Sequence, residues 1–267
     1  MFLSEQALLV IAATLFGAIL GSFLNALSFR FNTGRNIFKA MNGRSRCMHC
    51  NHALGVLDLV PVLSFVFLGG KCRYCRSKIS WQYPVVELVA ALLSGLLYLA
   101  HPEPLAYMFS LIFWMILLFT VVYDIKHTII PWSCSISLAV LALVYLFSGC
   151  VFTESCQLSA FSFLAGPLLA LPLFLTSLVS RGAWMGWGDS ALELSLGWIL
   201  GLSAGFTAFM LAFWSGAIIG LLLLVASRAG FFRYTIRSEI PFAPFLVLGA
   251  ALSYFLHVDF FSTISLL

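Results

Sequence analysis

Residues 8–29 of the chain read LLVIAATLFGAILGSFLNALSF, a stretch of 22 residues without a charged side chain. About 20 apolar residues cross the hydrocarbon core of a bilayer as a helix, so this stretch predicts a membrane span. Seven further apolar stretches follow, at about 83–100, 105–123, 130–148, 161–179, 191–204, 205–227 and 242–256. We therefore expect an all-α, polytopic integral membrane helical bundle of about eight spans. The sixth and seventh stretches are nearly fused, so a count of seven spans is the alternative.

The composition excludes a water-soluble enzyme. Of the 267 residues, 62% are hydrophobic and 9% are charged, whereas soluble domains are about 45–50% apolar and about 25% charged. Disordered, collagen-like and coiled-coil chains are also excluded, because each needs the opposite bias or a short repeat. A protein that lives in the lipid bilayer is the class that remains.

The basic residues indicate how the chain crosses the membrane. Nine of the 14 Lys and Arg residues lie in the long polar segment between the first two apolar stretches. Short cytoplasmic loops are enriched in Lys and Arg, so we expect this segment in the cytoplasm. Eight spans then place the other five, Lys126, Arg181, Arg228, Arg233 and Arg237, on the same side, with both termini outside. The net charge of +4 is thus interpreted as a topology signal, with no nucleic acid among the expected partners.

The segment 31–80 contains two CxxC motifs, Cys47-Met-His-Cys50 and Cys72-Arg-Tyr-Cys75. Two such motifs at this separation can hold one Zn2+ with four thiolates. A disulfide is not expected in the cytoplasm, and a loop of this size has little core of its own, so a metal would stabilise its fold. The residues alone favour a structural zinc site, because four thiolates leave no coordination position for a substrate. We divide the chain into a first span (1–30), a cytoplasmic four-cysteine loop (31–80) and a transmembrane bundle (81–267).

The remaining cysteines and the nearby histidines are given no catalytic role. His49 and His52 are expected to be bystanders of the metal site, and Cys134 a small buried residue of a span. Cys150 and Cys156 fall in an outside loop, where a disulfide is an open alternative.

Two aspartates are the candidate catalytic residues. Asp124 ends the third apolar stretch, and Asp189 begins the sixth in Gly186-Trp-Gly-Asp189. Charges within or at the ends of spans mark candidate sites, and the expected topology puts both carboxyl groups at one membrane face. Two neighbouring carboxyl groups share a proton and can activate water against an amide carbonyl, as in aspartic proteases.

Structural roles for these acids remain open at this stage. Asp189 also reads as a helix N-cap, and Asp124 could pair with Lys126 or lie among lipid headgroups. Glu193 follows Asp189 by one helical turn and either tunes the site or lines the bundle. Glu87 is the other acidic residue inside a span.

Together these motifs resemble the bacterial prepilin peptidases, also called type 4 prepilin leader peptidase/N-methyltransferases, which are GxGD-type aspartic proteases. The resemblance extends from about Ala18 to Phe245. The motifs that carry it are Gly21-Ser-Phe-Leu-Asn25, Arg46-Cys-Met-His-Cys50, Pro61-Val-Leu-Ser64, Gly70-Lys-Cys-Arg-Tyr-Cys75, Ile79-Ser-Trp-Gln-Tyr-Pro-Val-Val-Glu87, Asp124, Gly186-Trp-Gly-Asp189 and Pro241-Phe-Ala-Pro-Phe245.

The resemblance implies a bifunctional enzyme of the bacterial inner membrane. Such an enzyme removes the leader of type IV prepilins or pseudopilins at the cytoplasmic face, cutting after a Gly. It then methylates the new N-terminal residue with S-adenosylmethionine. By position, Asp124 and Asp189 are the catalytic pair, with the assignment of base and acid open, and Cys47, Cys50, Cys72 and Cys75 form a zinc loop associated with methyl transfer. The sequence contains no motif that identifies a binding site for the methyl donor, so the residues that bind it are not assigned.

Two positions depart from the family pattern. Trp132 follows Pro131 where the family usually has Asp, and Ala191 stands where a Lys usually follows the GxGD motif by two residues. Neither change removes a catalytic carboxyl group, so we expect cleavage to be retained and substrate positioning to be affected.

Other functions fit parts of the sequence. A transporter or channel could use the intramembrane carboxylates as an ion path, and a non-catalytic scaffold could use the zinc loop to dock a partner. A protease without methyl transfer is the third alternative, and the complete set of four cysteines argues against it.

Overall fold

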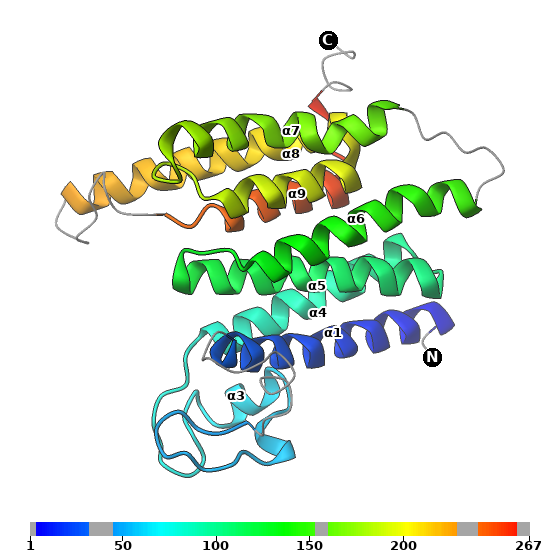
Figure 1. The fold of residues 1–267 in the computed structure, drawn as a ribbon. Helices are drawn as coiled ribbons and strands as arrows, with labels where there is room; N and C mark the ends of the chain where they lie inside the picture. Colours follow the sequence, from blue (N-terminus) through cyan, green and yellow to red (C-terminus); the bar gives the residue numbers. More distant parts are fainter. Residues whose placement is uncertain (1–3, 32–44, 153–159, 229–239, 261–267) are drawn as a thin grey trace. The chain divides into compact units, whose positions relative to one another are not determined.

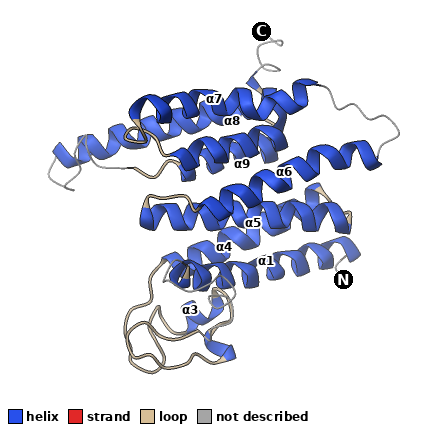
Figure 2. Ribbon diagram, in the orientation of Figure 1, coloured by secondary structure: helices blue, strands red, loops and turns tan. Residues whose placement is uncertain are grey.

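A computed structural model of the chain describes residues 4–31, 45–152, 160–228 and 240–260. Within these ranges the regular elements are helices, with two isolated β-bridges and no strand (Figure 2). The predicted all-α class is therefore confirmed. Cys156 lies outside the described residues, as does the side chain of Cys150, so their disulfide remains a prediction.

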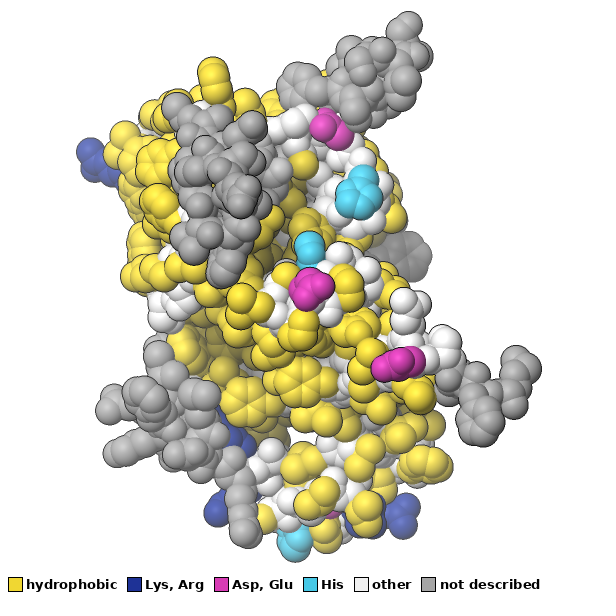
Figure 3. All heavy atoms as spheres, turned by 90° about the vertical axis from the view of Figure 1, so that its right-hand side faces the viewer, with side chains coloured by type: hydrophobic (Ala, Val, Ile, Leu, Met, Phe, Trp, Pro, Cys, Tyr) yellow, Lys and Arg dark blue, Asp and Glu magenta, His cyan; other side chains and the backbone are white. Residues whose placement is uncertain are grey.

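Five of the described helices are long and apolar enough to cross a membrane. They are α1 (Glu5–Arg30), α4 (Gln82–Ala100), α5 (Pro104–His127), α7 (Ala160–Ser180) and α8 (Trp187–Arg228). Two more apolar helices, α6 (Trp132–Phe152) and α9 (Ala243–Leu256), complete the set of longer helices in the described ranges (Figure 1). Large hydrophobic side chains are exposed on these helices, among them Leu15 (61%) of α1, Leu92 (63%) of α4 and Ile218 (59%) of α8, as expected for surfaces in contact with lipid. Hydrophobic side chains also predominate in Figure 3, which looks at the right-hand side of Figure 1, where the helix ends lie. The count of eight spans stays a prediction.

The chain divides into two compact units, residues 1–122 and 123–267. In the first unit, α1 packs on α4 through small residues. A Cβ atom on Gly21 would lie 2.7 Å from the Cβ of Ala90, so only glycine allows the two backbones to approach this closely. The Ser94 hydroxyl of α4 donates to the carbonyl of Ala13 on α1 at 2.6 Å. Small residues and hydroxyl bonds of this kind hold helices together in lipid, where the hydrophobic effect is weak.

In the second unit, α8 folds back on itself at Gly201. This residue has φ 78° and ψ 178°, a conformation open in practice only to glycine. A Cβ atom on Gly205 would lie 3.6 Å from the Cα of Gly197, whereas residues eight apart in a straight helix are separated by about 12 Å. The predicted sixth and seventh stretches are therefore two helical segments joined by a sharp turn, which lies a few residues before the predicted boundary (Figure 1).

Replacing Gly201 with Ala should destabilise the second unit by about 1–3 kcal/mol, because a Cβ atom strains this backbone conformation. The measurement is the unfolding midpoint of the purified protein in detergent. Gly220→Ala is the matched control, because Gly220 is helical and an added Cβ would meet Ile240 at an ordinary 3.5 Å. A Gly201→Ala midpoint at or above that of the wild type would contradict the turn.

Candidate active site and cysteine cluster

Asp124 lies in the last turn of α5, at the start of the second unit. Its side chain is buried, and its Oδ2 accepts a hydrogen bond of 3.2 Å from the backbone N–H of Ala243. Ala243 is the first residue of α9. The partial positive charge of a helix N-terminus suits a carboxylate oxygen at this point.

Asp189 is the third residue of α8 and is also buried. Its Oδ2 accepts the N–H of Gly186 at 3.2 Å, and its own N–H donates to the Gly186 carbonyl at 3.2 Å. Asp189 thus lies inside the first turn, in place of the N-cap position that the sequence also allowed. A Cβ atom on Gly188 would lie 2.6 Å from the Cβ of Ile130. The second glycine of the GxGD motif is therefore required by the packing of Ile130 against the start of α8.

The second unit brings the two aspartates together although 65 residues separate them in the sequence. Their carboxyl groups are near enough to interact electrostatically. Each carboxylate is held by one backbone N–H at the start of a helix, Asp124 by α9 and Asp189 by α8. Two buried carboxyl groups that interact in this way do not easily ionise together, which is the electrostatic situation of the carboxyl pair in aspartic proteases.

The two positions that depart from the family pattern lie near the same helix ends. Trp132 begins α6 and is 62% exposed. Ala191 is half-buried on α8, two residues after Asp189. The hydrogen bonds described for the carboxyl pair, from Ala243 and Gly186, involve neither residue.

The four cysteines of the first unit form a cluster. The Sγ atoms of Cys47, Cys50, Cys72 and Cys75 all lie within 4.8 Å of one another, and Cys47 is 3.8 Å from Cys75. Four sulfurs placed at about 2.3 Å around a tetrahedral metal would be about 3.8 Å apart. The cluster therefore fits one metal ion held by four thiolates, as the CxxC spacing predicted.

The two CxxC motifs reach this geometry with the same local fold. In each, the N–H of the first cysteine donates to the carbonyl five residues later, at 3.0 Å and 2.8 Å. The residue after each second cysteine, Asn51 or Arg76, is left-handed, with φ 56° and 58°. Each turn is closed by a β-bridge between its flanking residues. This repeated turn directs both sulfurs of a motif to one point.

Hydrogen bonds from neighbouring groups favour the ionised form of two of these sulfurs. The N–H of Cys50 is the main cause that lowers the pKa of the Cys47 thiol to about 6. The Ser77 hydroxyl, 3.1 Å away, lowers the pKa of Cys75. The pKa of Cys50 moves the other way: although the N–H of His52 lowers it, desolvation and the neighbouring thiols raise it to about 11. Four thiolates in one place repel one another, and a bound cation allows all four to ionise.

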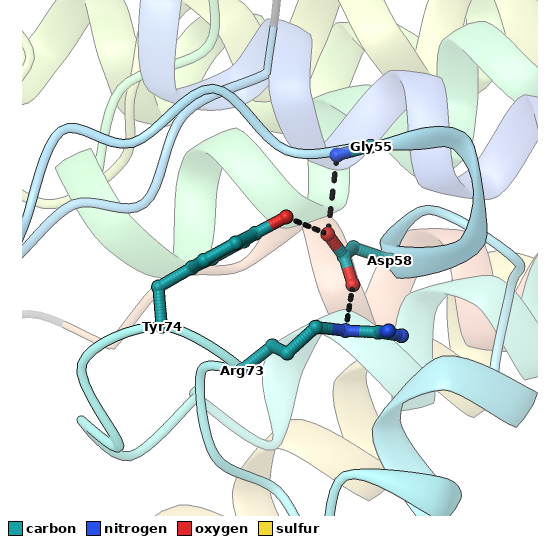
Figure 4. A network of polar contacts seen from close by, with 4 residues as sticks. All are labelled: Gly55, Asp58, Arg73 and Tyr74. Carbon is teal, nitrogen blue, oxygen red and sulfur yellow. Dashed lines mark hydrogen bonds and ion pairs between the residues drawn. The ribbon is translucent and has the colours of Figure 1, made fainter.

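Asp58 organises the cysteine loop, a role that was not inferred from the sequence. Its carboxylate pairs with Arg73 at 2.7 Å and accepts hydrogen bonds from the Tyr74 hydroxyl at 3.2 Å and the Gly55 N–H at 3.1 Å (Figure 4). Arg73 and Tyr74 are the middle residues of the second CxxC motif, so Asp58 ties this motif to the segment between the two. A signal was present, because Asp58 is the single acidic residue between positions 31 and 80.

Replacing Asp58 with Asn should loosen the second CxxC motif by about 1–3 kcal/mol, because the Asp58 carboxylate, which is 5% exposed, loses its charge-assisted contact with the half-exposed Arg73. We expect transfer of the bound metal to a chromogenic chelator to become about tenfold faster or more. Glu103→Gln is the control, since Glu103 is an exposed acid outside the loop. Equal transfer rates in Asp58→Asn and the wild type would refute this role.

Glu87 connects the cysteine loop to the helices of the first unit. Its Oε2 accepts the N–H of Val62 at 2.7 Å, and the Glu87 side chain is buried on α4. Asn25 of α1 donates to the carbonyl of Tyr83 and accepts from the amide of Gln82, each at 3.2 Å. The Val62 N–H thus gives Glu87 a structural partner in the cysteine loop, and the contacts of Asn25 join α1 to the start of α4.

Comparisons with known proteins match both units. The family model described as the bacterial peptidase A24 N-terminal domain matches residues 15–101, and the model of the type IV leader peptidase family matches residues 109–221. A prepilin leader peptidase/N-methyltransferase of Burkholderia pseudomallei is 34% identical, over 82% of this chain and 69% of the relative. One of Bacillus subtilis is 31% identical, over 90% and 91%. A type 4 prepilin-like proteins leader peptide-processing enzyme of Escherichia coli is 28% identical, over 97% and 98%. No solved structure matches significantly.

Proposed function

Because the chain belongs to the prepilin leader peptidase/N-methyltransferase family, we propose that Asp124 and Asp189 are the carboxyl pair with which it hydrolyses its substrate. The protein is a peptidase with methyltransferase activity that cleaves the leader of type IV prepilins and methylates the product. The observation that supports the catalytic pair is the placement of two buried carboxyl groups within electrostatic range, each held at a helix start.

The pair would work as a general base and a general acid. The ionised carboxylate takes a proton from water, and the water oxygen adds to the scissile carbonyl carbon. The protonated carboxyl group gives its proton to the carbonyl oxygen. When the C–N bond breaks, a proton passes to the departing amine, which becomes the new N-terminus.

The second reaction acts on that amine. We propose S-adenosylmethionine as the methyl donor. Bound to the protein, it would supply an electrophilic methyl group to the amine nitrogen, with S-adenosylhomocysteine and a proton as the other products.

Zn2+ is the metal that best suits the cysteine cluster, because four thiolates in a tetrahedral arrangement are typical of structural zinc sites. Cys47, Cys50, Cys72 and Cys75 would hold it. Bound there, the ion supplies a cross-link for a loop that has little core. We assign the loop 31–80 to the methyl-transfer half and the bundle 81–267 to the peptidase half.

The proposed setting is a multi-pass protein of the bacterial inner membrane. The excess of Lys and Arg between the first two apolar stretches supports a cytoplasmic cysteine loop. In that topology, the end of α5 and the start of α8 also face the cytoplasm. The pair would then meet the junction between the leader of a prepilin or pseudopilin and its apolar helix.

The test is an assay of the purified protein with a prepilin and a radiolabelled methyl donor. Leader removal is followed by electrophoretic mobility, and methyl transfer by label in the product. We expect both signals. A transporter or a scaffold would give neither, and a protease without methyl transfer would give the first alone.

A further inference from the structure

Glu193 is a buried acidic residue that has no role in the proposed hydrolysis mechanism. It is 1% exposed on α8, and among the described residues its Oε1 has no hydrogen-bond partner. It follows Asp189 by four residues, so the two share one face of the helix, one turn apart. Ser135 of α6 is a second buried polar residue, 2% exposed, and its hydroxyl has no hydrogen-bond partner among the described residues.

Helices α6 and α8 pack against each other, and both begin near the contact of Ile130 with Gly188. Ile130, just before α6, lies against Gly188 at the start of α8. Both helices run from this end of the second unit (Figure 1). Ser135 and Glu193 each follow that contact by five residues. Glu193 thus lies one turn from Asp189 on α8, and Ser135 lies in the first turn of α6, which packs against α8.

The fold gains nothing from a carboxyl group at this position. A buried polar group without a partner costs about 1–3 kcal/mol or more. Leu192 and Leu196, the buried neighbours of Glu193 on α8, are 0% and 2% exposed, so leucine packs well here. The carboxyl group is therefore placed to bind a small polar molecule that enters the unit.

We propose that Glu193 binds the water that the carboxyl pair consumes and delivers it to Asp189. This inference rests on the proposed function, since hydrolysis uses one water for each bond broken. Among the described residues no direct hydrogen bond joins Glu193 to Asp189, and water bridges groups one helical turn apart. Glu193 is thus a positioning residue, which acts on the nucleophile and leaves proton transfer to the aspartates.

The experiment compares Glu193→Leu and Glu193→Gln in the cleavage assay and in thermal unfolding. Leucine removes the unpaired carboxyl group, so we expect a higher unfolding midpoint together with a kcat about 10–100-fold lower and an unchanged KM. Glutamine still binds water at almost the same volume, so its kcat should stay within about threefold of the wild type. Ser195→Ala is the control, because the Ser195 hydroxyl is buried on the same helix and already bonded to the Ala191 carbonyl at 3.1 Å.

Three results would overturn the inference. The first is Glu193→Leu with an unchanged kcat, and the second is Glu193→Leu with a lower unfolding midpoint, which would give the carboxyl group a structural role. The third is Glu193→Gln as inactive as Glu193→Leu, which would require a carboxyl group in place of a water-binding side chain. The proposed function fails separately, if Asp124→Asn and Asp189→Asn both cleave normally.

Discussion

Replacing either Asp124 or Asp189 with Asn will reduce prepilin cleavage by a factor of about 10³ or more. Each aspartate is proposed to move a proton at a different atom, so neither can substitute for the other. Asparagine keeps the volume and one acceptor oxygen, which can still accept the N–H of Ala243 or Gly186. The variants should therefore fold normally, and the loss should appear in kcat.

Two controls make this result specific to proteolysis. The double variant should be about as inactive as each single variant, because residues that act as one unit have non-additive effects. Methyl transfer to a substrate whose leader has already been removed should stay near the wild-type rate in both single variants. If both variants retained normal cleavage, the aspartyl mechanism would be wrong.

Replacing Cys47 or Cys72 with Ser will release the metal and reduce methyl transfer by a factor of about 100 or more. A structural zinc site contributes about 10–16 kcal/mol of apparent binding free energy, and one missing thiolate breaks the tetrahedral set. Elemental analysis should find one zinc per chain in the wild type and almost none in the variants. Cleavage should be affected less, because the aspartates belong to the other compact unit.

Cys134→Ser is the matched control for the cysteine variants. Cys134 is a buried cysteine of α6 outside the cluster, so its replacement should leave the zinc content unchanged. Wild-type protein that contains no metal after purification without chelators would refute the zinc assignment. Methyl transfer that persists in metal-free protein would separate the loop from that reaction.

The sequence was most informative where chemistry depends on short spacings. Two cysteines three positions apart leave few geometries, so the CxxC pairs predicted a cluster in which Cys47 and Cys75 lie 3.8 Å apart. The apolar stretches predicted the long helices, because lipid leaves the backbone no other partner than itself. The two aspartates stood out because charged residues are rare in such stretches.

The sequence was least informative where the structure depends on distant partners. Asp124 accepts a hydrogen bond from Ala243, 119 residues away, and no local pattern indicates that contact. The role of Asp58 requires Arg73 and Tyr74 to fold back over it. Gly201 is one of three glycines spaced by four in an apolar stretch, with Gly197 and Gly205, and only its backbone angles distinguish it as the turn.

The hydrogen bond from Ala243 to Asp124 also determines at which point in its synthesis the chain can complete the carboxyl pair. A nascent chain that has been made only as far as Arg228 contains both aspartates but lacks the donor that holds the first of them. The pair is complete only after α9 has been inserted. Helix α9, to which no catalytic side chain is assigned, would thus determine when the newly made protein becomes a protease.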